Sequence, residues 1–219
     1  MSDSLDKHHP HQTHAPRVIC IAGGPGSGKG TQCRWLEQTF RLQHISIGDI
    51  LRDEMNRPSS PYADIIRQNM MAGTIGPKEV TLGVLKSHVL RSMQHGTNVF
   101  LLDGEYGLLL VLKHPANRSG FPRNLEQVGY FEEAIGQIEL VVLLKCSEDV
   151  LVDRLLQRGR FDDSDETIRG RLETFNEATS RIIEVFESRG RLKVIDGERT
   201  VAEVSEQLRS IFSGSVDTR

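Results

Sequence analysis

The residues best suited to chemistry lie in a glycine-rich loop that ends in a lysine. An apolar run at residues 18–22 precedes the loop, and Lys29 closes it. Four glycines stand between them, Gly23, Gly24, Gly26 and Gly28. Without side chains, the loop backbone can turn its N–H groups toward an anion, and the ammonium group adds positive charge. The loop is therefore predicted to bind phosphate groups.

The elements on either side of this loop support the same prediction. The β-branched run at 18–22 is typical of a buried parallel strand, and residues 29–40 are predicted to form a helix whose positive dipole end faces the anion. The general P-loop pattern places Ser or Thr directly after the lysine. Here Gly30 intervenes and the hydroxyl belongs to Thr31. A glycine-rich turn that binds nothing is the alternative, and the length and the strand-to-helix context of the pattern disfavour it.

Composition narrows the class of protein. A chain of 219 residues can bury one substantial core and a small inserted subdomain. The net charge of −3, with acids and bases interspersed, gives no field that would attract nucleic acid or a membrane. The scattered Cys20, Cys33 and Cys146 are typical of reduced thiols. Because there is no membrane-length apolar run and no signal-peptide pattern, we expect a soluble protein of the cytoplasm or nucleus.

The first 16 residues differ from the rest of the chain. They are polar and carry four histidines, His8, His9, His11 and His14. A metal-binding tract is one interpretation. A disordered His-rich tail at 1–16 is favoured because no partner ligands are evident, so the folded domain is expected to span 17–219.

Strands alternate with helices along the rest of the chain. Strands are predicted at 18–22, 42–46, 99–102, 140–144 and 192–195. Helices are predicted at 29–40, from about 46, at 62–72, 77–95, 124–135, 147–158 and 201–212, with one long helix or a helix pair at 163–189. This alternation predicts an α/β fold, a three-layer sandwich around a parallel five-stranded sheet. The helices between 46 and 95 follow one another without a strand and predict a helical lobe outside the sheet.

Asp103 is a further candidate for chemistry because it ends the predicted strand at 99–102. Open α/β sheets bind ligands at the carboxyl ends of their strands. A carboxylate there could order the water shell of a Mg²⁺ ion.

From Arg17 to Phe212 the chain resembles the nucleoside monophosphate (NMP) kinases, the family of adenylate and UMP/CMP kinases. The likeness rests on motifs in the family's order: the glycine loop, Ser-x-Gly-Asp-x-Leu-Arg at 46–52, residues 73–79, Asp-Gly at 103–104, Gly-Phe-Pro-Arg at 120–123, residues 154–163 and Arg-Leu-Glu at 171–173. It implies a monomeric P-loop NTPase domain with an NMP-binding lobe at about 46–76 and a short lid at about 158–166.

The resemblance also implies roles for individual residues. ATP would be bound by Gly24, Gly26, Ser27, Gly28, Lys29, Gly30, Thr31 and Arg158. The acceptor would be bound by Ile47, Arg52, Ile75, Gly104, Arg123 and Gln127. Lys29, Arg123, Arg160 and Arg171 would be catalytic. The Mg²⁺ of the ATP complex would have no direct protein ligand, and Asp103 and Thr31 are candidates to hold it through water. Phosphoryl transfer depends on positive charge held in place, so the number of arginines suits the reaction.

Three departures from the family pattern concern the site. Gly76 replaces the usual Val before Pro77, and the segment 157–161 is shorter than the usual lid loop. The largest departure is residues 105–120, which separate Asp-Gly from Phe-Pro-Arg and include the apolar run 108–112.

Two interpretations of residues 105–120 remain open. They form a genuine specificity loop, or they are a short retained intron translated in frame. The second is favoured because codons for 104–106 can read G-GTGAGTA, those for 116–117 can contain CTAAC and those for 119–120 can read TCAG-G. These are a splice donor, a branch point and an acceptor in the correct order. If the insert is real protein, weak activity is expected, because small displacements of positioning groups such as Arg123 are costly.

The acceptor base is the remaining choice. Residues 56–66 resemble the UMP/CMP branch, whereas 171–179 are closer to the adenylate branch, and Gln127 suits several bases. We predict an ATP-dependent NMP kinase with UMP or CMP as acceptor, and AMP as the alternative. A non-catalytic nucleotide-binding protein is the competing class. A P-loop motor or helicase is disfavoured, because the chain is short and no Asp/Glu-rich strand motif follows.

Overall fold

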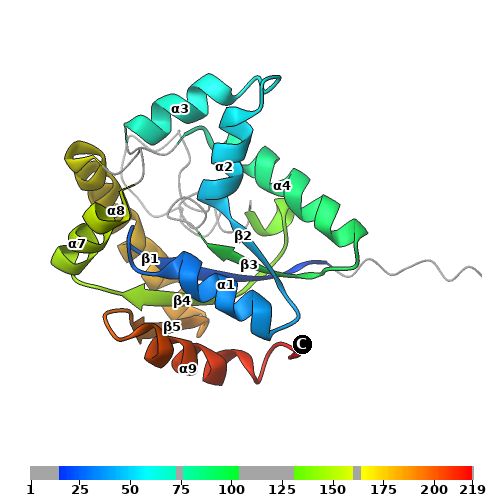
Figure 1. The fold of residues 1–219 in the computed structure, drawn as a ribbon. Helices are drawn as coiled ribbons and strands as arrows, with labels where there is room; N and C mark the ends of the chain where they lie inside the picture. The colour runs from blue at the N-terminus through cyan, green and yellow to red at the C-terminus, as the bar shows by residue number, and fades with distance from the viewer. Residues whose placement is uncertain (1–14, 73–75, 104–130, 160–163, 219) are drawn as a thin grey trace, which may run out of the picture.

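The computed structural model describes residues 15–72, 76–103, 131–159 and 164–218. The strands in this part of the chain form one sheet in the order β2-β3-β1-β4-β5, and every pair is parallel (Figure 1). Their bounds are β1 Arg17–Gly23, β2 Gln43–Ser46, β3 Val99–Asp103, β4 Ile138–Lys145 and β5 Leu192–Asp196. The predicted parallel five-stranded sheet is confirmed.

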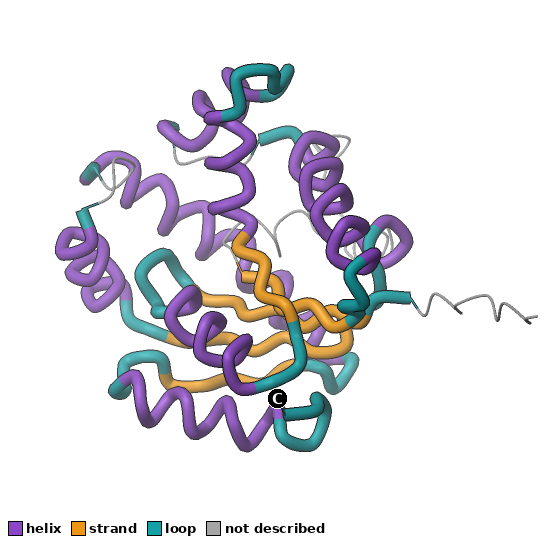
Figure 2. The backbone as a smooth tube through the Cα atoms, turned by 45° about the vertical axis from the view of Figure 1, so that its right-hand side comes forward, coloured by secondary structure: helices purple, strands orange, loops and turns teal. Residues whose placement is uncertain are grey.

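Helices cover the sheet and extend beyond it (Figures 1 and 2). They are α1 Lys29–Thr39, α2 Ile47–Asn56, α3 Ala63–Met71, α4 Lys78–Gln94, α7 Glu148–Arg158, α8 Asp165–Ser188 and α9 Val201–Phe212. The segment predicted as one long helix or a pair is the single helix α8. Of the helix predicted at 124–135, only the end lies within the described residues, and 131–134 are helical. None of the helices described is both long and apolar enough to cross a bilayer.

Alternating side chains of β1 join two separate cores. Ile19 and Ile21 pack with buried residues of α1 and α9, such as Leu36 and Leu208. Val18, Cys20 and Ala22 face the other side, where residues of α2, α4 and α8 pack. Successive side chains of a strand point to opposite faces, so β1 is buried on both. This arrangement is the predicted three-layer α/β sandwich.

The topology places the carboxyl ends of β1, β2 and β3 close together at one end of the sheet. In the register of the sheet, Ile21 of β1 and Ser46 of β2 both pair with Asp103 of β3. β1 lies between β3 and β4, so the connections on its two sides run in opposite directions. Such a switch point at the carboxyl ends of parallel strands is where open α/β sheets bind ligands.

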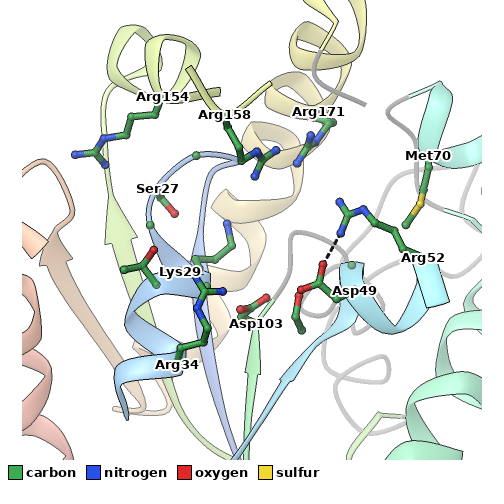
Figure 3. Close-up of a pocket in the computed structure, with 16 residues that line it drawn as sticks. Ser27, Lys29, Arg34, Asp49, Arg52, Met70, Asp103, Arg154, Arg158 and Arg171 are labelled. Atoms are coloured by element: carbon green, nitrogen blue, oxygen red, sulfur yellow. Dashed lines mark hydrogen bonds and ion pairs between the residues drawn. The ribbon is translucent and has the colours of Figure 1, made fainter. Parts of the chain in front are cut away.

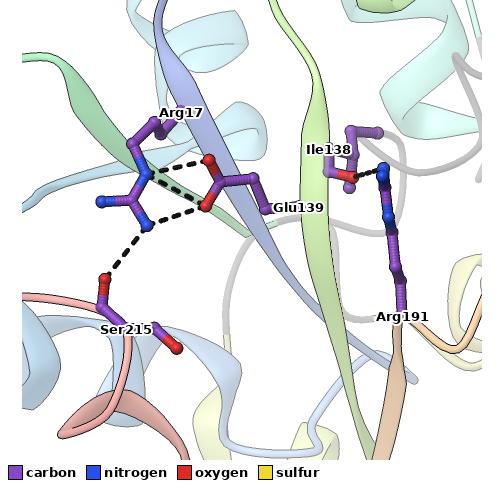
Figure 4. A network of polar contacts seen from close by, with 5 residues as sticks. All are labelled: Arg17, Ile138, Glu139, Arg191 and Ser215. Atoms are coloured by element: carbon purple, nitrogen blue, oxygen red, sulfur yellow. Dashed lines mark hydrogen bonds and ion pairs between the residues drawn. The ribbon is translucent and has the colours of Figure 1, made fainter.

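A polar network joins the strands at the opposite end of the sheet, where β1 and β4 begin (Figure 4). The guanidinium of Arg17 donates to both carboxylate oxygens of Glu139, at 2.8–3.0 Å, and to the carbonyl of Ser215 at 3.0 Å. Arg191 Nη1 donates to the carbonyl of Ile138 at 3.1 Å. These bonds join β1, β4, the start of β5 and the C-terminal segment at the end of the sheet far from Asp103.

Candidate active site

The glycine loop leaves the end of β1 and turns back into α1 (Figure 3). Gly26 and Gly28 have φ angles of 83° and 90°, a region that residues with side chains rarely adopt. At Gly26 a Cβ atom would also lie only 2.8 Å from the carbonyl oxygen of Leu151. The loop therefore requires glycine for both its conformation and its close packing on α7.

Lys29 and Ser27 give the loop its polar interior. Lys29 Nζ donates to the carbonyl oxygens of Gly23 at 2.6 Å and Gly24 at 2.7 Å, and the side chain is buried. Ser27 Oγ is buried and has no hydrogen-bond partner among the described residues. A buried hydroxyl without a partner destabilises the fold, and phosphate oxygens at this point would satisfy it. The loop thus fits the phosphate groups predicted from the sequence.

A cavity of about 260 Å³ opens beside the loop (Figure 3). Six cationic side chains from four helices are among the described residues that line it: Lys29, Arg34, Arg52, Arg154, Arg158 and Arg171. Asp49 and Asp103 are the carboxylates in the same lining. The described lining therefore carries an excess of positive charge, which suits a ligand with several phosphate groups.

The side of the cavity opposite the loop is built by the helical lobe. Arg52 of α2 points into the cavity, and its Nη1 donates to Asp49 Oδ1 at 2.7 Å (Figure 3). Met70 of α3 lines the same side. Arg52 thus lies across the cavity from Lys29.

Asp103 ends β3 beside the glycine loop. Its Oδ2 accepts a hydrogen bond from His44 Nε2 at 2.6 Å, and a Cβ atom at Gly30 would lie 3.7 Å from the same oxygen. Burial alone would raise the pKa of Asp103, but the hydrogen bond and charge of His44, the charge of Lys29 and a hydrogen bond with Ser46 together hold it below its ordinary value. The carboxylate therefore stays ionised next to the loop.

The structure brings many of the predicted site residues to this one cavity. Those that line it are Gly26, Ser27, Gly28, Lys29, Gly30, Thr31, Arg52, Asp103, Arg158 and Arg171. Gly24 is not part of the lining but accepts a bond from Lys29 through its carbonyl. The side chain of Ile47 does not reach the cavity: it is fully buried in the core beneath α2. Ile75, Gly104, Arg123, Gln127 and Arg160 lie outside the described residues.

Sequence reasoning missed several lining residues, namely Arg34, Ser46, Gly48, Asp49 and Met70. Arg34 lies one helical turn beyond Gly30, so helical periodicity alone could have placed it on the loop side of α1. Arg154 also lines the cavity, while its Nη1 donates to the carbonyl of Gly197 at 3.0 Å. Arg154 thus links α7 to the loop after β5.

These features together define a P-loop protein that binds nucleotide phosphates. A protein-family model described as an AAA domain matches residues 22–169. A uridylate kinase of Saccharomyces cerevisiae is 33% identical over 203 residues, covering 91% of this chain and 92% of that protein. A UMP-CMP kinase of Lentinula edodes is 34% identical over 226 aligned residues, covering 98% and 96%. A UMP-CMP kinase of Homo sapiens is 32% identical over 206 residues, covering 90% and 97%.

The chain therefore belongs to the UMP-CMP kinase family of nucleoside monophosphate kinases. The resemblance that the sequence motifs indicated is confirmed over most of the chain.

Proposed function

We propose that the chain transfers the γ-phosphoryl group of ATP to UMP or CMP. The observation that carries this proposal is the cavity itself, in which a glycine loop and arginines from separate helices face one another (Figure 3). Transfer between two phosphate-bearing ligands needs little covalent chemistry and much fixed positive charge. The names of the relatives support a pyrimidine acceptor, and AMP is the alternative.

Different residues of the described lining bind ATP and the acceptor. The loop and Lys29 hold the β- and γ-phosphates of ATP, and Ser27 Oγ gains the partner that it lacks. Arg52 binds the phosphate of the acceptor from the opposite side. Arg158 of α7 and Arg171 of α8 lie above the loop and stabilise the charge that moves between the ligands (Figure 3). Arg123 and Arg160 are proposed for the same task on the strength of the family motifs.

Mg²⁺ is proposed to accompany ATP, and the residues present fit it. The ionised Asp103 and the hydroxyl of Thr31 both line the cavity beside the loop, and oxygen donors of this kind are those that Mg²⁺ and its water shell prefer. When bound, the ion neutralises phosphate charge during transfer. Asp103 then orders water, while His44 holds the carboxylate in position.

A coupled assay of ADP formation tests the proposal. UMP and CMP are expected to give turnover well above AMP, and dCMP is assayed beside them. The variant Arg52→Ala should raise the KM for the acceptor with little change in the KM for ATP, because its side chain lies on the acceptor side. Binding of ATP without turnover for any acceptor would instead establish the competing class, a non-catalytic nucleotide-binding protein. Turnover with AMP alone would replace the pyrimidine acceptor by adenine.

Residues 105–120 require a separate test, since they lie outside the described residues and interrupt a site motif. We propose that they are a translated intron, because removing them restores Asp-Gly-Phe-Pro-Arg. The mature transcript should lack their codons, and deletion of 105–120 should increase the turnover number. A mature message that still encodes them, with full activity of the longer chain, would instead establish a genuine loop.

A further inference from the structure

Three potential metal ligands meet behind the glycine loop, and the proposed reaction uses only one of them directly. The Sγ of Cys33, a ring nitrogen of His44 and a carboxylate oxygen of Asp103 lie within 4.8 Å of one another. They come from α1, β2 and β3, three elements whose relative positions the sheet fixes. Cys33 and Asp103 are buried, and the His44 side chain is only 9% exposed.

The three atoms lie near enough for side-chain rotations to bring them around a single metal ion. Zinc bonds of 2.3 Å to sulfur and about 2.1 Å to nitrogen and oxygen place neighbouring ligand atoms about 3.4–3.6 Å apart. The His44–Asp103 pair, now 2.6 Å apart, would open by about 1 Å, whereas all three atoms already lie within 4.8 Å of one another. Side-chain rotations alone can supply shifts of this size.

The chemistry of the three donors selects the metal. A thiolate and an imidazole prefer Zn²⁺ and similar borderline-soft ions, whereas Mg²⁺ prefers oxygen donors only. Three protein ligands leave a fourth tetrahedral position for water. With Cys33 as thiolate and Asp103 ionised, the site carries two negative charges, which balance a divalent cation. In the absence of metal, burial and the charge of Asp103 raise the pKa of the Cys33 thiol well above its ordinary value, although Lys29 and Arg34 act in the opposite direction. The thiolate therefore forms only as the metal binds.

We propose that Cys33, His44 and Asp103 form a site for a single thiophilic divalent cation, Zn²⁺, with water as the fourth ligand. The thiol of Cys33 loses its proton to solvent as the Zn–S bond forms. The Nε2 proton of the charged His44 ring also leaves to solvent as Nε2 binds the metal, so its hydrogen bond to Asp103 breaks. No electrons are transferred.

The site has a consequence that rests on the proposed function. Zn²⁺ would hold the carboxylate that otherwise orders the water shell of Mg²⁺, because Asp103 belongs to both sites. Zn²⁺ at the site should therefore inhibit the kinase. Because Mg–ATP competes with Zn²⁺ for Asp103, a high concentration of Mg–ATP should relieve the inhibition. Metal binding itself does not depend on catalysis, so the two claims can fail separately.

The test uses the full chain with His8, His9, His11 and His14 replaced by Asn, so that the N-terminal histidines bind no metal. Co²⁺ is titrated as a spectroscopic substitute, and Zn²⁺ then displaces it. We expect one Co²⁺ per chain and a sulfur-to-cobalt charge-transfer band in the near-ultraviolet. Cys33→Ser keeps a hydroxyl beside Asp103 but removes the soft ligand, and it should abolish the band and weaken Zn²⁺ binding at least about 100-fold. The matched control is Cys146→Ser, which should keep both.

Each outcome bears on the proposal. Absence of a thiolate band in the parent chain, or a band that survives Cys33→Ser and disappears in Cys146→Ser, overturns it. If Cys33→Ser unfolds, the variant His44→Gln replaces it, since glutamine can still donate to Asp103 but is a poor zinc ligand. The charge-transfer band should then weaken and shift. An unchanged band would overturn the proposed site. A thiolate band without inhibition by Zn²⁺ retains the site and rejects its effect on the kinase.

Discussion

The ammonium nitrogen of Lys29 lies 2.6 Å from the carbonyl oxygen of Gly23, the residue that ends β1. The lysine is therefore held by the backbone of its own loop before any phosphate is present. Little further conformational entropy is lost when phosphate oxygens take the place of the carbonyls. The central cation of the proposed site is thus positioned in advance by the fold.

The first prediction concerns this lysine. Lys29→Met should lower kcat by about 10²–10³-fold, the usual effect of removing one preorganised donor from a developing charge. Lys145→Met is the matched control, because Lys145 is exposed at the end of β4, and it should leave kcat unchanged. Coupled kinetics at saturating ATP and UMP measure both. Equal losses in the two variants would contradict the role of Lys29.

A second prediction compares two glycines of the loop. Gly28→Ala introduces only backbone strain, about 1–2 kcal/mol, because nothing lies within 4 Å of its added Cβ. For a chain of this size that corresponds to a Tm decrease of about 2–8 °C. Gly26→Ala should lower Tm further, since its Cβ would also press on the Leu151 carbonyl at 2.8 Å. Thermal unfolding of both variants gives the comparison, and equal decreases would mean that α7 moves away freely.

The third prediction concerns the geometry of Arg171, a buried arginine in the cavity lining. Arg171→Lys keeps the charge but loses the planar fork that binds phosphate with two bonds. We expect kcat to fall by about 10²-fold or more, with a smaller change in KM. Arg169→Lys, on the exposed side of the same helix, is the control. Unchanged kcat in Arg171→Lys would show that charge alone suffices at this position.

The fourth prediction addresses the link between the helical lobe and α8. Thr167 Oγ1 donates to the carbonyl of Met71 at 3.2 Å, and Thr167 is buried. Thr167→Val removes this bond, and a net loss of about 1 kcal/mol should raise the KM for the acceptor about 5-fold. Thr167→Ser keeps the hydroxyl and should stay near the parent value. Steady-state kinetics with varied UMP separate the two variants, and equal KM values would exclude the bond as a contributor.

The fifth prediction follows from the lowered pKa of Asp103. Because its folded-state pKa lies below the unfolded value of about 3.9, the ionised carboxylate stabilises the fold fully above about pH 4. That contribution is lost as the pH falls through the folded-state pKa. The free energy of unfolding of Asp103→Asn, measured with urea between about pH 3 and 7, should therefore depend less on pH than that of the parent chain. Parallel curves would contradict the stabilising bond with His44.

Local sequence patterns predicted the elements well where one residue type decides the conformation. Helix α9 spans Val201–Phe212, the predicted range, and Thr200 with Glu203 forms a reciprocal cap at its start. The start of α7 shows the limit of such reasoning, because serine is a typical N-cap residue. Ser147 occupies the N-cap position, but its side chain makes no capping bond, and its N–H instead donates to Glu198 at 2.6 Å. Glu198, 51 positions further along the chain, thus bonds to the residue that the local sequence favours as a side-chain cap.

The site was predictable where a motif names its residues, and less so where tertiary packing decides. The loop and Lys29 carry their own pattern, so their place at the end of β1 followed from the sequence. The fully buried Ile47 illustrates the opposite case, because its side chain turns into the core while its neighbours Ser46 and Gly48 line the cavity. The meeting of Cys33 with His44 and Asp103 depends on strand order, which periodicity does not contain.

The central place of β1 in the sheet also constrains how the chain is made. Its two neighbours are β3 and β4, and β4 begins only at Ile138. During synthesis, β1 leaves the ribosome well before β4, so one of its two edges stays unpaired until residues 138–145 have followed. Until then an apolar edge stays open to other chains. Slow translation of the middle of the chain should therefore reduce the yield of folded protein, although the finished enzyme is unchanged.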